Sequence, residues 1–352
     1  MTDKFYSKRR FLFWIKLFGI LMLSAMYANW LWDLPHSIFR DRDNYLIYAS
    51  TPSLLIAQVF SSKSFLFKEP LFLLLNQGFL LLFGDPVRTI NTFVFFITFA
   101  TAFFSFFRTR SFLLGVVVLF FLFIQTQYLG MQLVTIRQGI GTALLLFLFP
   151  VIQKKYLIFL LFFICSLIHN SFYIITLFYI VYWILNEKLK IKSFAKKISI
   201  FTGFGFLFFS VFFTISKSIE TKQNLQSLEE SGASGSGGAF LMWAIILGYL
   251  LIFKRSTNKT DTSQRIFDLA IIGLVIYLTG YFLTPIVGRM IGIVIPFIAI
   301  SLTERFRVRD LFFFGFVLAI NFYLYFNGAF EGFLNVSLET FHHYIFSDTK
   351  FF

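Results

Sequence analysis

Apolar runs of about 14–22 residues recur along the whole chain, and short basic clusters separate them. A run of this length can cross the hydrocarbon core of a bilayer, about 30 Å, as an α-helix. Apolar and polar residues do not alternate within the runs, which argues against a transmembrane β-barrel. Of all residues, 58% are hydrophobic and 14% are charged, whereas about a quarter are charged in a soluble domain. The sequence therefore predicts an all-α polytopic integral membrane protein, with a single polytopic membrane domain over residues 1–352.

The formal net charge of +14 is distributed as small clusters between the apolar runs. This placement is typical of cytoplasmic loops under the positive-inside rule, and it argues against nucleic acid as a partner. The single cysteine, Cys165, lies within an apolar run, so the sequence offers no disulfide framework or thiolate metal site. The sequence as a whole indicates no metal or cofactor. Asp33-Leu34-Pro35 follows the first apolar run, Phe11–Trp32, without a small-residue cleavage site, so we expect this run to be a retained anchor.

The charged clusters also predict a topology. Placing all of them on the cytoplasmic side requires an even number of crossings between consecutive clusters. The result is about eleven crossings, with the N-terminus cytoplasmic and the C-terminus outside. Residues 33–69 and about 216–239 become external loops, the second containing the Gly/Ser-rich run SGASGSGG, typical of a flexible hairpin. Residues 70–83 become a re-entrant or interfacial helix. The clusters are Lys8-Arg9-Arg10, Arg108-Thr109-Arg110, Lys154-Lys155, Glu187 to Lys197, Lys254 to Arg265 and Glu304 to Asp310.

Three charged or titratable residues reach one depth in this topology. Arg137, His169 and Arg289 lie 17, 14 and 15 residues from the nearest cytoplasmic cluster, about 21–26 Å along a helix. Each alone has an ordinary alternative: a snorkelling arginine, a hydrogen-bonded residue at a helix break, and an arginine paired with a loop acid. Polar groups at one depth, however, need burial or a water-filled cavity. We therefore predict an externally open cavity, lined by Arg137, Gln138, His169, Asn170 and Arg289.

The external loop 33–69 adds two polar stretches, Arg40-Asp41-Arg42-Asp43-Asn44-Tyr45 and Lys68-Glu69-Pro70. Alternating charge is typical of a solvated surface, and the alternative is that the loop folds over the cavity mouth. Two arginines facing one cavity suit an anionic ligand, because guanidinium binds phosphate bidentately. A histidine or carboxylate nearby can act as a general base. The candidates for that role are His169, Asp41, Asp43 and Glu69.

The order and spacing of these motifs resemble the EpsG family of Wzy-type polysaccharide polymerases, over nearly the whole chain. Acidic residues and Tyr45 follow the first crossing, and four further motifs come later in the chain. They are Glu69-Pro70-Leu71-Phe72, Ile136-Arg137-Gln138-Gly139, Leu167-Ile168-His169-Asn170-Ser171 and Gly288-Arg289-Met290.

The resemblance implies a bacterial enzyme of the cytoplasmic (inner) membrane, GT-C-like in general character. Such enzymes join undecaprenyl-diphosphate-linked oligosaccharide repeat units on the outer face of that membrane, as in O-antigen, capsule and exopolysaccharide synthesis. The reaction is glycosyl transfer from a lipid diphosphate, without a metal or nucleotide sugar. Besides the lipid-linked substrate and the bilayer, the expected partners are a chain-length regulator and a flippase.

The same resemblance implies roles for individual residues. Arg137, Arg289 and Gln138 would bind the diphosphate, and Arg40, Tyr45 and Asn170 would make other substrate contacts. Two alternative functions stay open at this point. One is a flippase for the same lipid-linked sugar, and the other is a different external transferase, such as a glycan ligase or membrane acyltransferase.

Overall fold

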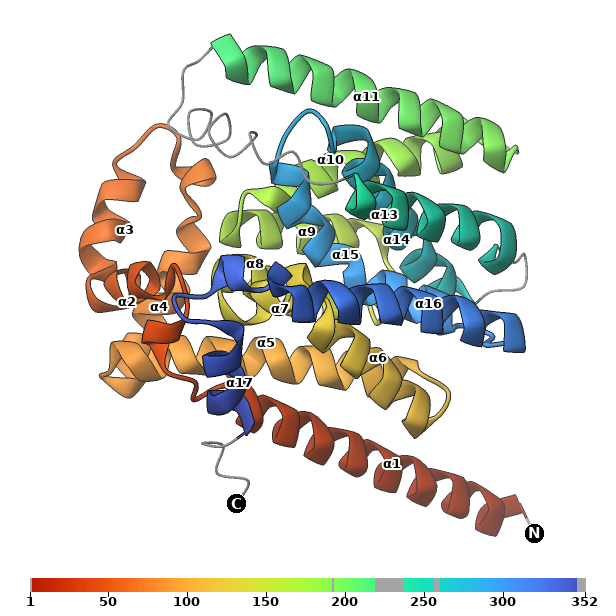
Figure 1. Cartoon of the computed structure of the whole chain (residues 1–352), viewed down its shortest axis with the longest axis horizontal. Coiled ribbons are helices and arrows are strands. Elements are labelled where there is room, and N and C mark those ends of the chain that lie inside the picture. Colours follow the sequence, from red (N-terminus) through yellow and green to blue (C-terminus); the bar gives the residue numbers. More distant parts are fainter. Residues whose placement is uncertain (1, 192, 219–236, 256–259, 347–352) are drawn as a thin grey trace. The chain divides into compact units, whose positions relative to one another are not determined.

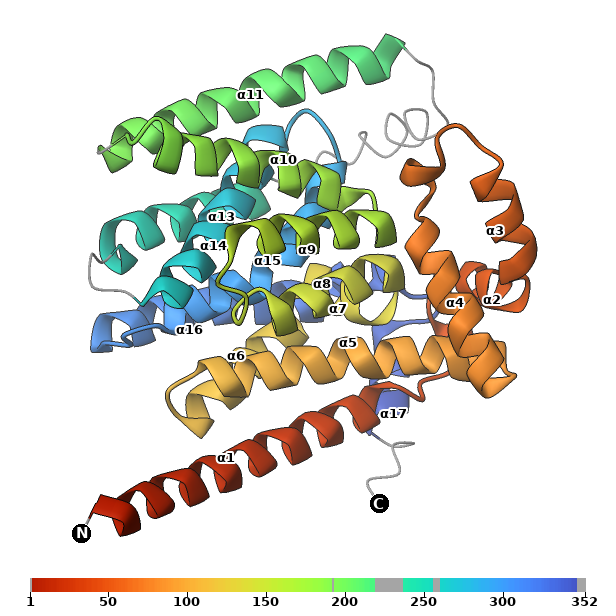
Figure 2. The same cartoon turned by 180° about the vertical axis from the view of Figure 1, so that it is seen from behind.

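The computed structural model describes residues 2–191, 193–218, 237–255 and 260–346 (Figures 1 and 2). Every regular element in these ranges is helical, and extended backbone pairs there only at one isolated bridge, Phe39 with Leu334. The all-α prediction is therefore confirmed. Most of the predicted Gly/Ser-rich loop 216–239 lies outside the described ranges.

The chain divides into two compact units. The first unit comprises residues 1–152, 164–170 and 318–352, and the second comprises 153–163 and 171–317. Two helices, α9 (Lys155–Ile168) and α16 (Val308–Leu324), contribute one end to each unit.

The first unit is built around α5, a long helix that packs against α1, α6 and α8. Figures 1 and 2 show α1 and α5 side by side. The Asp85 carboxylate caps α5 by accepting a hydrogen bond from the Val87 N–H at 2.9 Å, and Pro86 occupies its first turn. The other elements are α1 (Thr2–Leu31), η1 (His36–Ile38), α2 (Arg42–Ser50), α3 (Pro52–Phe60), η2 (Phe65–Lys68), α4 (Pro70–Phe83), α5 (Pro86–Arg108), α6 (Phe112–Ile124), α7 (Thr126–Leu133), α8 (Ile136–Leu148), η5 (Tyr325–Ala329), η6 (Glu331–Phe333) and α17 (Leu338–Phe346).

The second unit is built around α14 and α15, which pack closely along their length. Gly273 of α14 allows this approach, because a Cβ atom added there would lie 2.2 Å from Val294 Cγ2 of α15. The elements of this unit are α10 (Ser171–Trp183), η3 (Ile184–Lys188), α11 (Phe194–Ser218), α13 (Gly238–Tyr249), η4 (Leu250–Lys254), α14 (Asp261–Gly280) and α15 (Ile286–Thr303).

Six helices in the described ranges are long and apolar enough to cross a membrane, and a pair bent by 83°, α6 with α7, would be a seventh. The prediction of about eleven crossings is therefore wrong. The sequence overestimates the count because several apolar runs fold into helices of about 14 residues, including α4, α8 and α9. Such a helix is about 21 Å long, shorter than the 30 Å hydrocarbon core. The six spans are Phe11–Leu31, Pro86–Arg108, Phe194–Ile215, Asp261–Gly280, Ile286–Thr303 and Val308–Ala329.

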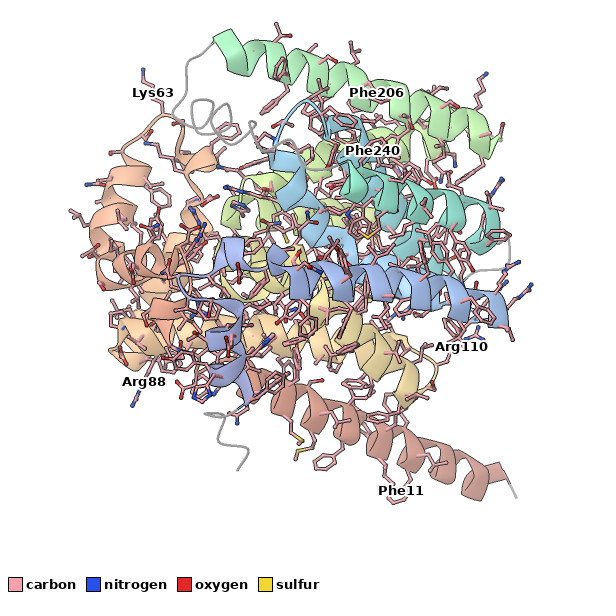
Figure 3. The ribbon with its side chains drawn as sticks, viewed as in Figure 1. Phe11, Lys63, Arg88, Arg110, Phe206 and Phe240 are labelled. Carbon is pink, nitrogen blue, oxygen red and sulfur yellow. The ribbon has the colours of Figure 1, made fainter. Side chains whose placement is uncertain are left out.

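Large apolar side chains are exposed on many of these helices. Figure 3 marks Phe11 on α1 and Phe206 on α11, which are 65% and 52% exposed. Exposure of so much apolar surface is unfavourable in water but not against lipid tails. The chain is thus a multi-pass membrane protein.

The close packing of α14 on α15 predicts different effects for two glycine substitutions. Gly273→Ala should lower the free energy of unfolding by about 1–3 kcal/mol, because its Cβ overlaps Val294. Gly248→Ala, on α13, meets no atom within 4 Å and should be neutral or stabilising, by up to about 1 kcal/mol, because alanine favours the helix. Thermal unfolding of the detergent-solubilised variants measures both effects. Equal effects at the two positions would contradict this packing.

Candidate active site

Glu69 is the centre of a cluster of polar side chains in the first unit. It lies between η2 and α4 and adopts a left-handed backbone conformation, with φ of 54°. That conformation costs roughly 1–2 kcal/mol for a residue with a Cβ atom. Pro70 follows at the first position of α4, where its fixed φ suits the start of a helix. The Glu69 side chain is only 9% exposed, so its carboxylate needs partners inside the protein.

His169 and Asn170 provide two of these partners from the break between α9 and α10. The ring Nδ1 of His169 lies 2.5 Å from Glu69 Oε1. The backbone N–H of Asn170 also donates to Oε1, at 3.3 Å. The side-chain amide of Asn170 donates to the Phe67 carbonyl at 2.7 Å and so ties the helix break to η2. His169 is thus a hydrogen-bonded residue at a helix break, one of the alternatives that the sequence left open, and it also contacts the buried carboxylate.

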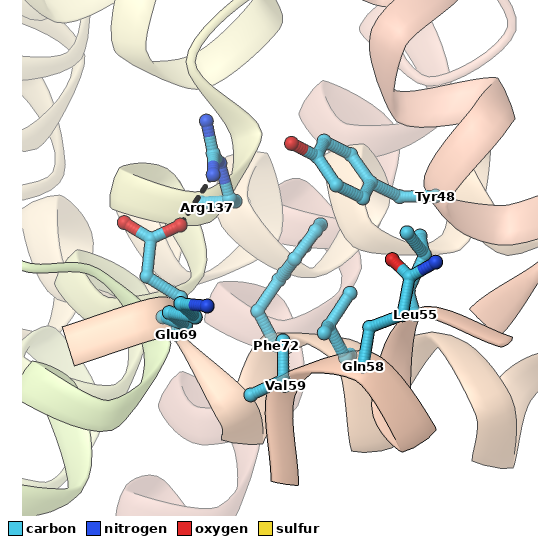
Figure 4. Close-up of a pocket in the computed structure, with 9 residues that line it drawn as sticks. Tyr48, Leu55, Gln58, Val59, Glu69, Phe72 and Arg137 are labelled. Atoms are coloured by element: carbon cyan, nitrogen blue, oxygen red, sulfur yellow. Dashed lines mark hydrogen bonds and ion pairs between the residues drawn. The ribbon is translucent and has the colours of Figure 1, made fainter. Parts of the chain in front are cut away.

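Arg137 provides the third partner, from the first turn of α8. Its Nη1 forms an ion pair with Oε2 of Glu69 (Figure 4). The guanidinium also lies over three aromatic rings of the α2–α4 region, at 5.7 Å from the centroid of Tyr45, 5.4 Å from Tyr48 and 6.0 Å from Phe72. The Arg137 side chain is 31% exposed, so it still faces open space while it holds Glu69.

These contacts determine the charge state of the cluster. Burial by itself raises the pKa of Glu69, but the hydrogen bond of His169, the charge of that ring when it is protonated, and then the charge of Arg137 more than offset it. The pKa of Glu69 consequently lies below its ordinary value of 4.5, and the group is a carboxylate at neutral pH. A carboxylate only accepts hydrogen bonds, so the Nδ1 of His169 carries the proton. In a neutral ring, Nε2 is then the basic nitrogen.

A cavity of about 240 Å³ lies beside Glu69 and Arg137 (Figure 4). It is smaller than the roughly 300–1,000 Å³ of pockets for drug-sized ligands, so it suits one small group of a larger substrate. Its two cationic side chains, from Lys68 and Arg137, outnumber its single carboxylate, which favours an anionic or polar group. The lining residues are Tyr48, Leu55, Gln58, Val59, Lys68, Glu69, Phe72, Leu73 and Arg137.

Arg42 is a buried arginine that supports the site from behind. It is fully buried, and its Nε donates to the carbonyl of Leu133 at 2.7 Å. Leu133 is the last residue of α7, and α8, which carries Arg137, begins three residues later at Ile136. Arg42 therefore holds the backbone that leads into α8. Its Nη1 lies 3.3 Å from Nδ1 of His36. Burial, and then the charge of Arg42, lower the pKa of His36 to about 4, so that ring is neutral and accepts this hydrogen bond.

The structure thus brings together only part of the predicted set. Tyr45 is buried against Arg137. Gln138, the residue after Arg137 on α8, is also buried. Arg40 instead donates to the Leu334 carbonyl at 2.9 Å. Asp41 and Asp43, at the start of α2, make no described hydrogen bond or ion pair with Glu69, Arg137 or His169.

Arg289 lies in the first turn of α15 and belongs to the second unit, so its part in this site stays a prediction.

Sequence reasoning did not single out three residues that the structure places in or behind the site. Tyr48 lies one helical turn beyond Tyr45, a spacing that puts both on one face, and Lys68 is adjacent to Glu69. Arg42 carries no signal that separates it from Arg40.

The fold and the cluster define a multi-pass α-helical membrane protein with a buried acid–histidine–arginine site beside a small cavity. The model of the EpsG family matches residues 44–346. The chain therefore belongs to the EpsG family, the family of Wzy-type polymerases. Membership supports a function of the polysaccharide-polymerase type in general. Comparisons with curated proteins and with solved structures gave no match.

The partners of Glu69 predict a pH-dependent contribution to stability. Because its folded-state pKa is lowered, the contribution is present above the ordinary value of 4.5 and disappears as the pH falls through the folded-state value. Glu69→Gln should lower the free energy of unfolding at pH 7 by on the order of 1–3 kcal/mol, and the deficit should shrink at acidic pH. Thermal unfolding of the wild type and of Glu69→Gln between pH 3 and pH 7 measures this deficit in stability.

Glu339→Gln is the matched control, because Glu339 is exposed on α17. It should change stability by less than about 0.5 kcal/mol at any pH. A deficit of Glu69→Gln that stays constant over the pH range would contradict the role assigned to the carboxylate.

Proposed function

We propose that this protein is a bacterial polysaccharide polymerase that joins undecaprenyl-diphosphate-linked oligosaccharide repeat units on the outer face of the cytoplasmic membrane. The observation that carries the proposal is the Glu69–His169–Arg137 cluster, of which Glu69 and Arg137 line a small cavity, in a chain of the EpsG family. The cluster combines a base with an orienting acid and adds a cation. Glycosyl transfer from a lipid diphosphate needs both functions.

In the proposed reaction, a hydroxyl of the acceptor sugar attacks the anomeric carbon of the donor repeat unit. The bond between that carbon and the diphosphate oxygen breaks, and the lipid diphosphate leaves. The hydroxyl proton passes to Nε2 of His169, whose Nδ1–H donates to the Glu69 carboxylate. Glu69 fixes the tautomer of the ring and stabilises the imidazolium that forms, as the acid does in a catalytic triad.

Arg137 is the proposed cation for the leaving group. Negative charge grows on the diphosphate as the glycosidic bond breaks, and a cation held in place beforehand stabilises that charge selectively. A guanidinium has five N–H donors, so Arg137 can keep its ion pair with Glu69 and still contact an anion in the cavity. Lys68, on the same cavity wall, adds a second positive charge. Arg289 and Gln138 stay proposed diphosphate ligands.

Among the candidate bases, His169 with Glu69 is favoured over Asp41 and Asp43 because the pair is assembled and directly linked to Arg137. Asn170 is proposed to position Glu69 through its backbone N–H. Tyr45 is proposed to orient the Arg137 guanidinium and Arg40 to contact substrate. The rest of the rate enhancement over the uncatalysed reaction would come from holding the two long substrates side by side.

Complementation of a deletion strain tests this function. Deletion should leave the surface glycan as single repeat units, and the wild-type gene should restore a ladder of chain lengths on a gel. Arg137→Ala and Glu69→Gln should fail to restore the ladder although the proteins insert in the membrane. Arg88→Ala should restore it, because Arg88 is exposed and pairs only with the neighbouring Asp85, at 3.7 Å, among its described contacts.

A ladder that persists in the deletion strain would refute the polymerase function. Repeat units trapped on the cytoplasmic leaflet would indicate a flippase. A polymer that forms but is not attached would indicate a ligase, and a normal polymer lacking one substituent would indicate an acyltransferase.

The proposed base makes a separate prediction for His169. Glutamine can donate a hydrogen bond to Glu69 but cannot take a proton, so His169→Gln should lower the polymerisation rate about 10²- to 10⁴-fold. His343→Gln, at an exposed histidine of α17, should not change it. The rate is measured as polymer formed per unit time in membranes supplied with lipid-linked repeat units. Full activity of His169→Gln would show that the ring only donates a hydrogen bond.

A further inference from the structure

A second cavity, of about 430 Å³, lies within the second unit. One end of each of three helical segments forms it: the start of α9, the end of α10 with η3, and the first turns of α14. It is almost twice as large as the cavity beside Glu69. The proposed polymerisation chemistry uses none of its lining residues.

Charges of both signs face this cavity. At its rim, Nζ of Lys155 forms an ion pair with Oε2 of Glu187 at 2.8 Å, with side chains 58% and 42% exposed. Arg265 contributes a guanidinium from α14, and Asp261 and Asp268 contribute carboxylates from the same helix. A simple anion would meet three carboxylates here, and a simple cation would meet two basic groups. The lining therefore favours a ligand that carries both a positive and a negative group.

Aromatic rings of α10 also line this cavity. Tyr179, Tyr182 and Trp183 follow one another at helical spacing and share one face of α10. The hydroxyl of Tyr182 donates to Asp268 Oδ1 at 3.0 Å, and the Gln264 amide donates to the same oxygen at 2.7 Å, so ring and carboxylate are held together. An ammonium group binds well where aromatic faces and a carboxylate converge.

Two further observations agree with a ligand of this kind. Two of these rings already bind ammonium groups of the protein itself, because Nζ of Lys197 lies 5.5 Å from the centroid of the Tyr182 ring and Nζ of Lys188 lies 5.5 Å from that of the Trp183 ring. The indole Nε1 of Trp183 is buried and has no hydrogen-bond acceptor among the described residues. A buried donor of this type is normally satisfied by a partner or by water.

The cavity also lies at one end of a helix that is long and apolar enough to cross a membrane. Asp261 begins the span Asp261–Gly280, so the first turns of α14 lie at one end of a membrane crossing. Tryptophan and tyrosine, which both line the cavity, are enriched at the ends of membrane crossings, at the level of the headgroups.

We propose that this cavity binds the zwitterionic headgroup of phosphatidylethanolamine. The ammonium lies against the α10 rings and Asp268, and the phosphate contacts Lys155 and Arg265 through charge-assisted hydrogen bonds. This site is separate in chemistry from polymerisation, and the proposal does not rest on the proposed function.

Native mass spectrometry of the full-length, detergent-purified protein tests the proposal. The protein is incubated with equal amounts of phosphatidylethanolamine and phosphatidylglycerol, and the retained lipid is counted. The wild type should retain phosphatidylethanolamine in preference. Asp268→Asn and Lys155→Gln should each weaken its retention up to about tenfold, as expected for loss of one charged contact. Lys155 is at the exposed rim, so its substitution leaves the fold intact even if Asp268→Asn does not.

Lys154→Gln is the matched control, because Lys154 neighbours Lys155 but does not line the cavity. It should retain lipid as the wild type does. Soluble glycerophosphoethanolamine should compete with the lipid, which separates recognition of the headgroup from burial of the acyl chains. Equal retention of the two lipids, unchanged retention by Lys155→Gln, an equal loss in Lys154→Gln, or no competition by the soluble headgroup would each overturn the proposal. None of these readouts depends on polymer formation.

Discussion

The buried carboxylate of Glu69 is the interaction on which the candidate site depends. An isolated carboxylate is strongly disfavoured in a protein interior, so its position is stable only with cationic and hydrogen-bonding partners. Glu69 has them from two other segments, the start of α8 with Arg137 and the helix break with His169 and Asn170. These residues are about 70–100 positions away in the sequence. One side chain therefore determines where the three segments meet, and the same contacts give the histidine and the arginine their orientations.

Short helices are what make such a site possible in a membrane protein. Helices α4, α8 and α9 are each 13–14 residues long. The start of α4, the start of α8 and the end of α9 meet around Glu69 and present polar backbone and side chains there. The left-handed conformation of Glu69 turns the chain sharply into α4. Gly139 lets α8 approach α5 closely, since a Cβ atom there would lie 2.6 Å from Ile97. Arg42 then holds the backbone between α7 and α8 through the Leu133 carbonyl. The backbone strain at Glu69 and the burial of Arg42 are balanced by this packing.

The site could be predicted from the sequence in part. Counting helix rise from the basic clusters put Arg137 and His169 at one depth, and both contact Glu69 in the structure. The eleven-crossing topology behind that count was wrong, because an apolar run shows that a segment avoids water but not whether it spans the bilayer or ends inside the bundle. Glu69 was one of four candidate acids and bases, and nothing in the sequence separated it from Asp41 or Asp43. Its distinction comes from tertiary contacts alone.

The sequence by itself determined the class of this protein: its apolar runs require a helical membrane protein, and its ordered motifs point to the EpsG family, which the family model matches over residues 44–346. Local composition was also enough for the first span, because the apolar run Phe11–Trp32 matches the helical span Phe11–Leu31. Only the tertiary structure decided which carboxylate meets Arg137, that Arg42 is buried while Arg40 binds a distant carbonyl, and that two cavities form. The reason is physical: hydrophobic periodicity is a property of neighbouring residues, whereas the pairing of a buried charge depends on segments that are far apart in the chain.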